Sequence, residues 1–306
     1  TLRIVYGVFG YGRGHATRAQ GVLPALLERH EVLVLAGGDA YEALAPLFPV
    51  ERIPTLGYAY GRGGRRSNLA TLRRNASLVR EVLFRGPSFR RVRSTLDAFQ
   101  PTLVISDAEP WTHQAAAALG IPRIGFDHFG IMAYCRPELA PQDRLLSARD
   151  VAVYRALMGR PDRVVVSSFY RAPPAYPGVS FVGPLLRDEV FRYESRPGEH
   201  LLVYLNQGRH QLTARLLDTL HRLPCPVLVY GAGRQGNDGR IEYRAPSNEG
   251  FLADLAGCRA VFSTAGNQLV GEALHYGKAL LVVPEDCVEQ RMNAAAVERL
   301  GIGVQA

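Results

Sequence analysis

Apolar runs of strand length alternate with helix-length amphipathic segments along the first half of the chain. Helices are predicted between the runs, over residues 16–30, 67–99 and 110–120. Such alternation is typical of an α/β protein with a parallel sheet. The predicted strands are LRIVYGVF (2–9), EVLVLAG (31–37), TLVISD (102–107), PRIGFDH (122–128) and RVVVSS (163–168).

A second series of the same kind follows a polar, charged stretch, RDEVFRYESRPGEH, that resembles an interdomain linker. We therefore predict two doubly wound, Rossmann-like α/β domains facing across a cleft: an N-terminal domain over 1–184, a linker over 185–199 and a C-terminal domain over 200–306. No closing helices follow the last strand, so we expect the C-terminal domain to be incomplete. The predicted strands lie at 201–208, 226–233, 240–246, 260–266 and 279–284.

Composition supports a globular protein, because 47% of the residues are hydrophobic. No stretch approaches the ~20 apolar residues of a membrane span, and no cationic leader precedes an apolar run. The expected location is the cytoplasm. The cysteines form no CxxC pair, which indicates neither a disulfide framework nor a zinc site; they are Cys135, Cys225, Cys258 and Cys287.

The net charge of +8 comes almost entirely from arginine, since Lys278 is the only lysine. Ten arginines but only one acid, Glu81, occupy residues 62–93. Two interpretations are open: peripheral contact with an anionic membrane at its inner face, or an ordinary solvated helix face. The apolar stripe beside these cations is Leu69, Leu72, Ala76, Val79 and Leu83, which is membrane-facing in the first case and core in the second. Nucleic acid is disfavoured, because the block lacks interleaved aromatic residues and no known binding motif is present.

A glycine-rich turn, FGYGRGHATR (9–18), follows the first predicted strand. Gly10 and Gly12 match the start of a dinucleotide fingerprint, but its third glycine is replaced by His15, and Asp39 is a weak candidate for its ribose acid. We instead expect Gly12 and Gly14 to give a ligand room near the following helix. Imidazole titrates near neutral pH, so His15 is a candidate general base; a helix-capping role is the alternative.

Asp107 ends the strand LVISD, and the carboxyl ends of parallel strands meet at one edge of a sheet. Asp107 is therefore predicted to orient His15 and to stabilise its protonated form. Glu109 is the alternative, and either carboxylate can instead cap the helix expected to begin near Pro110.

The most specific stretch is STAGNQLVGEALHYGKALLVVPEDCVEQRMNAAAVERLGIG (263–303). Its small-residue turn opens a predicted helix whose N-terminus can bind a diphosphate without metal. Glu272 can reach a ribose diol, and Glu289, Gln290 and Asn293 on the next helix can contact sugar hydroxyls. The residues predicted at the turn are Thr264, Ala265, Gly266, Asn267 and Gln268.

Over 261–303, and over the GYGRGHATR turn, the chain resembles nucleotide-diphosphate-sugar glycosyltransferases of the GT-B fold, particularly UDP-glucosyltransferases and the peptidoglycan N-acetylglucosaminyltransferase family. The resemblance implies that Gly266 and Glu272 bind diphosphate and ribose, and that Glu289 and Gln290 contact the donor sugar, with glutamate where aspartate is commoner. The resemblance also implies that His15 is the base and that Asp107 is its partner. Thr264 stands where plant-type members have a histidine that touches the pyrophosphate.

The expected activity is an inverting, metal-independent transfer from a nucleoside-diphosphate sugar, with UDP favoured by the resemblance, to a hydroxyl of a lipid or small-molecule acceptor. No DxD triplet or carboxylate cluster suggests a bound Mg²⁺ or Mn²⁺, and no cofactor is expected. The alternatives are a nucleotide-sugar 2-epimerase of the same fold and a non-catalytic nucleotide-sugar-binding protein.

Overall fold

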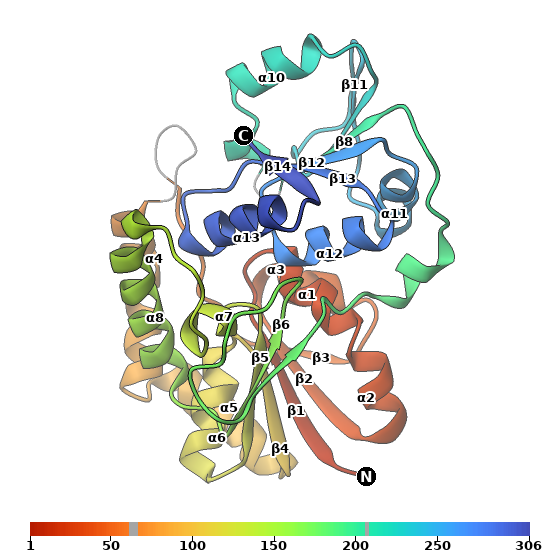
Figure 1. The fold of residues 1–306 in the computed structure, drawn as a ribbon. Coiled ribbons are helices and arrows are strands. Elements are labelled where there is room, and N and C mark those ends of the chain that lie inside the picture. The colour runs from red at the N-terminus through yellow and green to blue at the C-terminus, as the bar shows by residue number, and fades with distance from the viewer. Residues whose placement is uncertain (61–66, 206–207) are drawn as a thin grey trace. The chain divides into compact units, whose positions relative to one another are not determined.

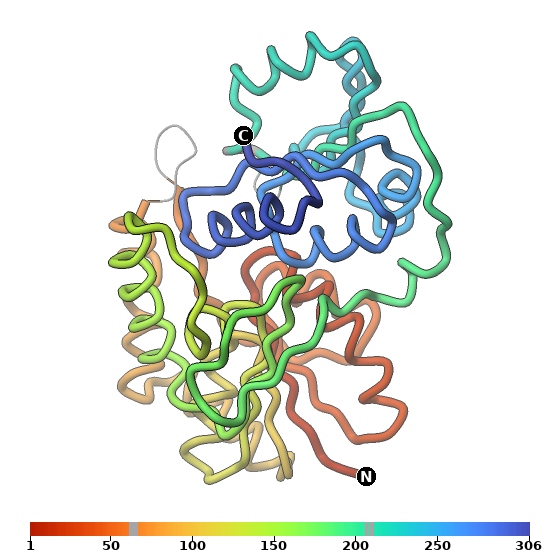
Figure 2. The backbone as a smooth tube through the Cα atoms, in the orientation of Figure 1, coloured from red at the N-terminus to blue at the C-terminus, as the bar shows by residue number. Residues whose placement is uncertain are grey.

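The computed structural model describes residues 1–60, 67–205 and 208–306. The chain folds into two compact units, one built from residues 1–59 and 68–185 and the other centred on residues 186–306. Figures 1 and 2 show that each unit holds its own sheet with helices packed on it. Three members of the arginine block, Arg62, Arg65 and Arg66, and the predicted strand positions 206–207 lie outside the described residues.

The first unit contains a parallel sheet with the strand order β3-β2-β1-β4-β5-β6-β7. The order reverses beside β1, so the loops after β1 and β4 leave the same edge next to each other. The strands are β1 (Arg3–Val8), β2 (Glu31–Ala36), β3 (Val50–Arg52), β4 (Leu103–Asp107), β5 (Arg123–Asp127), β6 (Arg163–Ser167) and β7 (Val179–Val182).

Helices cover both faces of this sheet, and alternate residues of β1 accordingly pack into two different cores. Val5 packs with Phe89 and Trp111 on one face, whereas Tyr6 packs with Ala16 and Leu23 on the other. The helices are α1 (Arg13–Gln20), α2 (Leu23–Arg29), α3 (Gly38–Leu44), α4 (Asn68–Leu83), α5 (Pro87–Phe99), α6 (Pro110–Leu119), α7 (Gly130–Ala133) and α8 (Arg144–Met158), with a 3₁₀ turn, η2, at Pro141–Asp143.

The second unit repeats the plan, with the strand order β10-β11-β9-β8-β12-β13-β14; all pairs are parallel except β10 with β11. Val203, Val227 and Phe262 belong to one buried core. The strands are β8 (Leu201–Tyr204), β9 (Val227–Tyr230), β10 (Gly236–Asp238), β11 (Ile241–Tyr243), β12 (Ala260–Ser263), β13 (Ala279–Val282) and β14 (Gly303–Gln305). The helices are η3 (Asp188–Arg192), α9 (Gly208–Gln211), α10 (Ala214–His221), α11 (Asn248–Ala256), α12 (Asn267–His275) and α13 (Val288–Arg299).

Two predicted helices are each divided in the structure. The helix expected over 16–30 ends at Gln20 and resumes at Leu23, with Pro24 in the first turn of α2. The helix expected within 67–99 breaks where Arg85 adopts a left-handed backbone (φ 56°) before Gly86 and Pro87. Strands β3, β7, β10 and β14 were not predicted, because runs of three or four residues are too short to show a clear period.

The segment predicted as a linker packs closely on the second unit. The hydroxyl of Tyr276 donates to the Val190 carbonyl at 2.6 Å, and the hydroxyl of Ser195 donates to the Tyr276 carbonyl at 2.6 Å. Lys278 donates to the Arg196 carbonyl at 2.7 Å. These contacts make residues 187–196 part of the framework around α12.

Candidate functional site

The turn between β1 and α1 is fixed by its own backbone and by Asp39. Gly12 has a left-handed backbone (φ 76°), and its N–H donates to the Asp39 carboxylate at 2.8 Å. The Asp39 N–H donates to the Gly10 carbonyl, also at 2.8 Å. A Cβ on Gly10 would lie 2.4 Å from the Gly37 carbonyl oxygen, so only glycine fits there. Asp39 therefore stabilises the turn through two hydrogen bonds. The dinucleotide interpretation considered it only as a ribose-binding acid.

Gly14 differs from the other glycines of this turn. It lies in the first turn of α1, and a Cβ added to it would meet no atom within 4 Å. Glycine is also a poor helix residue, costing about 1 kcal/mol relative to alanine. Since neither packing nor backbone geometry requires this glycine, the space beside it is open to a ligand.

The structure brings His15 and Asp107 together although 92 residues separate them. His15 Nδ1 lies 2.6 Å from Asp107 Oδ1. A terminal nitrogen of Arg18 also lies 3.1 Å from Nδ1, but the carboxylate is the nearer partner and can only accept. We therefore assign the proton of the neutral ring to Nδ1, which leaves Nε2 with the lone pair that a base needs. The edge of the Phe9 ring packs against the imidazole, with 5.3 Å between the ring centroids. The side chain of His15 is 25% exposed, which leaves it accessible to a substrate.

Arg18 completes this group and was missed as a partner of Asp107. Its Nε and a terminal nitrogen donate to the two Asp107 oxygens at 2.7 and 2.6 Å, and the side chain is 4% exposed. His15 and Arg18 are three residues apart on α1, so both side chains face the end of β4. That spacing is the signal that could have identified Arg18.

The electrostatics of Asp107 follow from its burial and its partners. Burial alone would raise the pKa of this carboxyl, but the charges of Arg18 and His15 outweigh burial and hold the pKa below its usual range. Asp107 is consequently an anion beneath His15, suited to stabilising an imidazolium.

Glu109 has the other role that the sequence left open. Its carboxylate accepts from the backbone N–H groups of Trp111 at 2.9 Å and Thr112 at 2.8 Å, which caps α6. Burial raises the pKa of this carboxyl to about 7, against the effect of these hydrogen bonds. Asp107 therefore orients His15, and Glu109 starts the helix.

A second acid was missed at the end of the neighbouring strand β5. Asp127 accepts from the Gly130 N–H at 2.7 Å and from the Tyr154 hydroxyl at 2.6 Å. Burial raises the pKa of Asp127, and the charge of Asp107 acts in the same direction. Because its oxygens hold α7 and α8 in place, Asp127 supports the edge on which Asp107 lies.

In the second unit, the turn predicted to bind diphosphate has an unusual backbone. Ala265 has a positive φ of 63°, and Asn293 donates to its carbonyl at 2.9 Å. Asn293 is therefore a support of the turn, where a contact to sugar hydroxyls was predicted. Thr264, Asn267 and Gln268 are buried around the turn.

Gly266 caps α12 without a side chain. Its backbone is extended (φ −66°, ψ 130°), and an added Cβ would meet nothing within 4 Å. Gly266 itself supplies no side-chain cap, and the N–H groups and positive dipole end of a helix N-terminus are suited to binding an anion. As at Gly14, the fold does not require a glycine here.

Glu272 is engaged within its own unit. It forms an ion pair with Arg187 at 3.1 Å, and both side chains are buried. Burial raises the pKa of Glu272, and the Arg187 charge only partly offsets that effect. A ribose that binds Glu272 would have to share the carboxylate with Arg187.

Gln290 and Glu289 lie in the first turn of α13, after the turn that follows β13. Gln290 accepts from the Glu285 N–H at 2.7 Å and is buried, whereas Glu289 is partly exposed. Of the two, Gln290 fixes the turn and Glu289 has the freer side chain.

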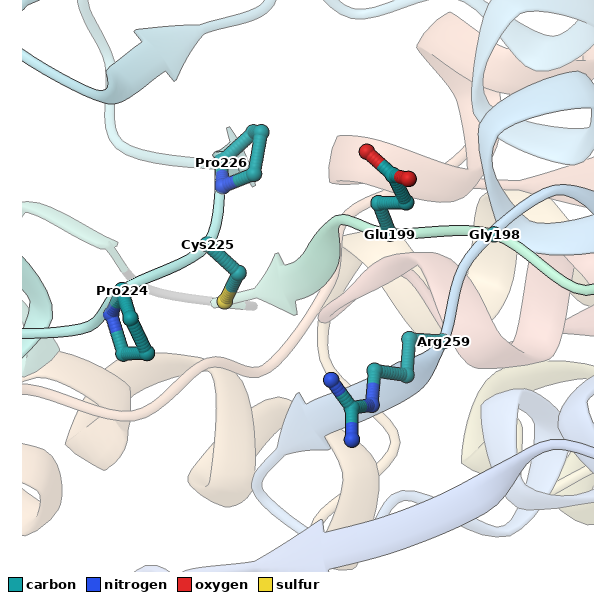
Figure 3. A pocket seen from close by; sticks show the side chains of 6 residues that line it. All are labelled: Gly198, Glu199, Pro224, Cys225, Pro226 and Arg259. Carbon is teal, nitrogen blue, oxygen red and sulfur yellow. The ribbon is translucent and has the colours of Figure 1, made fainter.

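A shallow hollow of about 320 Å³ lies at the opposite edge of the second sheet (Figure 3). Its residues come immediately before β8, β9 and β12, at the amino ends of the strands, and the charged ends of Glu199 and Arg259 point apart. Ligands of parallel sheets bind at the carboxyl ends, so the turn before α12 is the better candidate. The hollow is lined by Gly198, Glu199, Pro224, Cys225, Pro226 and Arg259.

Across residues 1–60, 67–205 and 208–306, no three His, Cys, Asp or Glu side chains are grouped to hold a metal ion. Within the same ranges, none of the helices combines the length and apolar character needed to cross a bilayer.

A sequence model of the family described as glycosyl transferase family 1 matches residues 2–306, nearly the whole chain. The chain belongs to this family. It is therefore a glycosyltransferase, a transferase enzyme, as the resemblance implied. Its two sheets of parallel strands flanked by helices confirm the predicted α/β fold of the GT-B type.

Relatives of the enzyme include an uncharacterized glycosyltransferase of Methanosarcina acetivorans, 23% identical over 327 residues that cover 99% of this chain and 85% of the relative. Solved structures with the same fold include the glycotransferase of kitacinnamycin, with a TM-score of 0.68 and 18% identity over 100% of this chain and 86% of that one. Another is Arabidopsis thaliana UGT89C1 in complex with quercetin, with a TM-score of 0.69 and 17% identity over 99% and 84%.

Proposed function

We propose that this glycosyltransferase moves a sugar from a nucleoside-diphosphate sugar, UDP being the favoured nucleotide, to an acceptor hydroxyl with inversion at the anomeric carbon. The observation that carries the proposal is the 2.6 Å contact between His15 Nδ1 and Asp107. It leaves Nε2 as the basic nitrogen, on a partly exposed ring beside the open space at Gly14.

In the proposed step, His15 Nε2 accepts the proton of the acceptor hydroxyl while the oxygen attacks the anomeric carbon from the face opposite the nucleotide. The bond from that carbon to the diphosphate oxygen breaks, and its electron pair leaves with the nucleoside diphosphate. Asp107 stabilises the imidazolium, and Arg18 keeps Asp107 ionised and in place.

The donor diphosphate is proposed to bind at the N-terminus of α12, where Gly266 leaves room, and the positive end of the helix would stabilise the charge that develops on the leaving group. Thr264 would add a hydroxyl contact, and Glu272, shared with Arg187, would bind the ribose. Glu289 is the proposed contact to the donor sugar. Metal is not required in this scheme, because the helix end supplies the positive potential.

Turnover of UDP-sugars and dTDP-sugars with a panel of alcohols, followed by the anomeric configuration of the product, tests the proposal. Inversion that persists after chelation of divalent metals supports it, and retention contradicts it. Conversion of the donor without any acceptor would identify a nucleotide-sugar epimerase instead. Binding without turnover would identify a non-catalytic protein.

A further inference from the structure

Helix α4 presents an apolar stripe to solvent. Leu69 is 59% exposed and Leu72 is 62% exposed, and Ala76 and Leu83 are exposed on the same side. These positions follow helical spacing, i, i+3, i+7 and i+14. The buried residues of α4 are Asn75 and Val82, which lie about 100° around the helix from Ala76 and Leu83. The stripe is therefore not the side by which α4 packs on its own unit.

The turn after α4 adds an exposed aromatic residue. Arg85 adopts the left-handed backbone that an arginine rarely takes, and Phe84 beside it is 76% exposed. The neighbouring helix α8, which contacts α4 and lies beside it in Figures 1 and 2, adds exposed Leu145 and Val153. Exposed apolar clusters of this kind mark interaction surfaces.

Cations outnumber acids on α4, the following turn and α5. The arginines of α4, of the following turn and of α5 are exposed, while Glu81 is engaged with the Ser88 N–H at 2.7 Å. The exposed arginines are Arg73, Arg74, Arg80, Arg85, Arg90, Arg91 and Arg93. Aliphatic and aromatic side chains beside a dense row of cations match an anionic lipid surface, where the apolar groups enter the acyl boundary and the arginines meet headgroup phosphates.

This face is connected to the turn that carries His15. The Asn75 side chain accepts from the Gly57 N–H at 3.0 Å and donates to the Gly57 carbonyl at 2.6 Å. The next residue, Tyr58, packs edge-on against Tyr11 of the β1–α1 turn, with 5.0 Å between centroids. A partner that contacts α4 would therefore contact the same unit that carries His15, the proposed base.

We propose that the α4 face, defined as Leu69, Leu72, Leu83 and Phe84 with Arg73, Arg80 and Arg85, docks the enzyme peripherally on an anionic membrane. The docking does not depend on the proposed function. The helix lies along the surface, and no membrane span is involved.

Co-sedimentation of the full chain with lipid vesicles tests the docking. Binding to mixed phosphatidylcholine and phosphatidylglycerol vesicles should exceed binding to pure phosphatidylcholine about tenfold or more, and should fall at high salt. The variants L72S/F84S and R73S/R80S should each lower binding about tenfold. The controls L47S and R29S change other exposed side chains elsewhere on the unit and should bind like the wild type.

Equal binding by all variants, or no binding of the wild type to anionic vesicles at low salt, overturns the docking. A wild-type dimer that the L72S/F84S variant cannot form would show that a second copy covers the face, and would overturn it too. Nucleotide binding, measured on the same variants without vesicles, should stay unchanged. If the wild type did not bind nucleotide, that result would count against the proposed function and not against the docking. Failure of the docking and failure of the proposed function are therefore distinguishable.

Discussion

The buried pair of Arg18 and Asp107 should be worth several kcal/mol to the first unit when one partner is removed. The change D107N keeps the shape of the side chain but removes the charge that accepts both hydrogen bonds from Arg18. A buried cation left without its carboxylate costs about 3–5 kcal/mol. Asp127 also acts on Arg18 through its charge and offsets part of the loss. We therefore expect about 3 kcal/mol.

Urea unfolding followed by tryptophan fluorescence measures this loss. Trp111 is the only tryptophan of the chain and is fully buried in the first unit, so the signal reports on that unit. The matched control is D150N, which breaks the largely exposed Arg149–Asp150 pair and should cost at most about 1 kcal/mol. A loss for D107N of under about 1 kcal/mol, or no greater than for D150N, would refute the electrostatic account of the site.

Three further predictions follow from the geometry. H15A should lower turnover by about 10²-fold or more, with nearly unchanged nucleotide affinity, in steady-state kinetics and calorimetry; full turnover would contradict a base role. G14A should raise the stability of the free enzyme by up to about 1 kcal/mol but lower activity, because its methyl group enters the open space; unchanged activity would show that no ligand uses that space. Burial raises the pKa of Glu109 to about 7 in the folded state, so the stability that this group contributes should fall as the pH rises from about 4.5 to 7. The variant E109Q should flatten that part of the profile of unfolding free energy against pH. An E109Q profile identical to that of the wild type would contradict this prediction.

The sequence predicted the parallel α/β plan because long apolar runs show their period directly. It also placed His15 and Asp107 at one edge, because strand ends converge there, and the structure shows the two side chains in contact. Their catalytic roles, like those of the donor-site residues, stay predictions.

Contacts that depend on the packing of distant segments were beyond the sequence. The ion pair of Glu272 with Arg187 joins residues 85 positions apart. Arg187 lies in the stretch 185–199, whose polarity indicated only a linker. The hydrogen bond from Asn293 to the Ala265 carbonyl was also not predicted, because a buried amide that binds a distant backbone carbonyl has no local pattern. The exposure of Leu69 and Leu72 was left open, since an amphipathic stripe has the same spacing whether it faces a core or a membrane.

In the proposed function the diphosphate of a nucleotide sugar binds at the N-terminus of α12, beside Gly266. Thermal unfolding of the wild type, G266D and G266N, with UDP, dTDP, GDP, ADP and NAD⁺, tests it most directly. Both variants should cap α12 and keep or slightly raise the midpoint without ligand, because Asp and Asn are favoured caps in this extended conformation. The account predicts that one nucleoside diphosphate at 100 times its dissociation constant stabilises the wild type by about 2.7 kcal/mol. That gain should disappear in G266D, whose charge repels the phosphates, and be reduced less in G266N. No stabilisation by any nucleoside diphosphate, or equal stabilisation of the wild type and G266D, would contradict it.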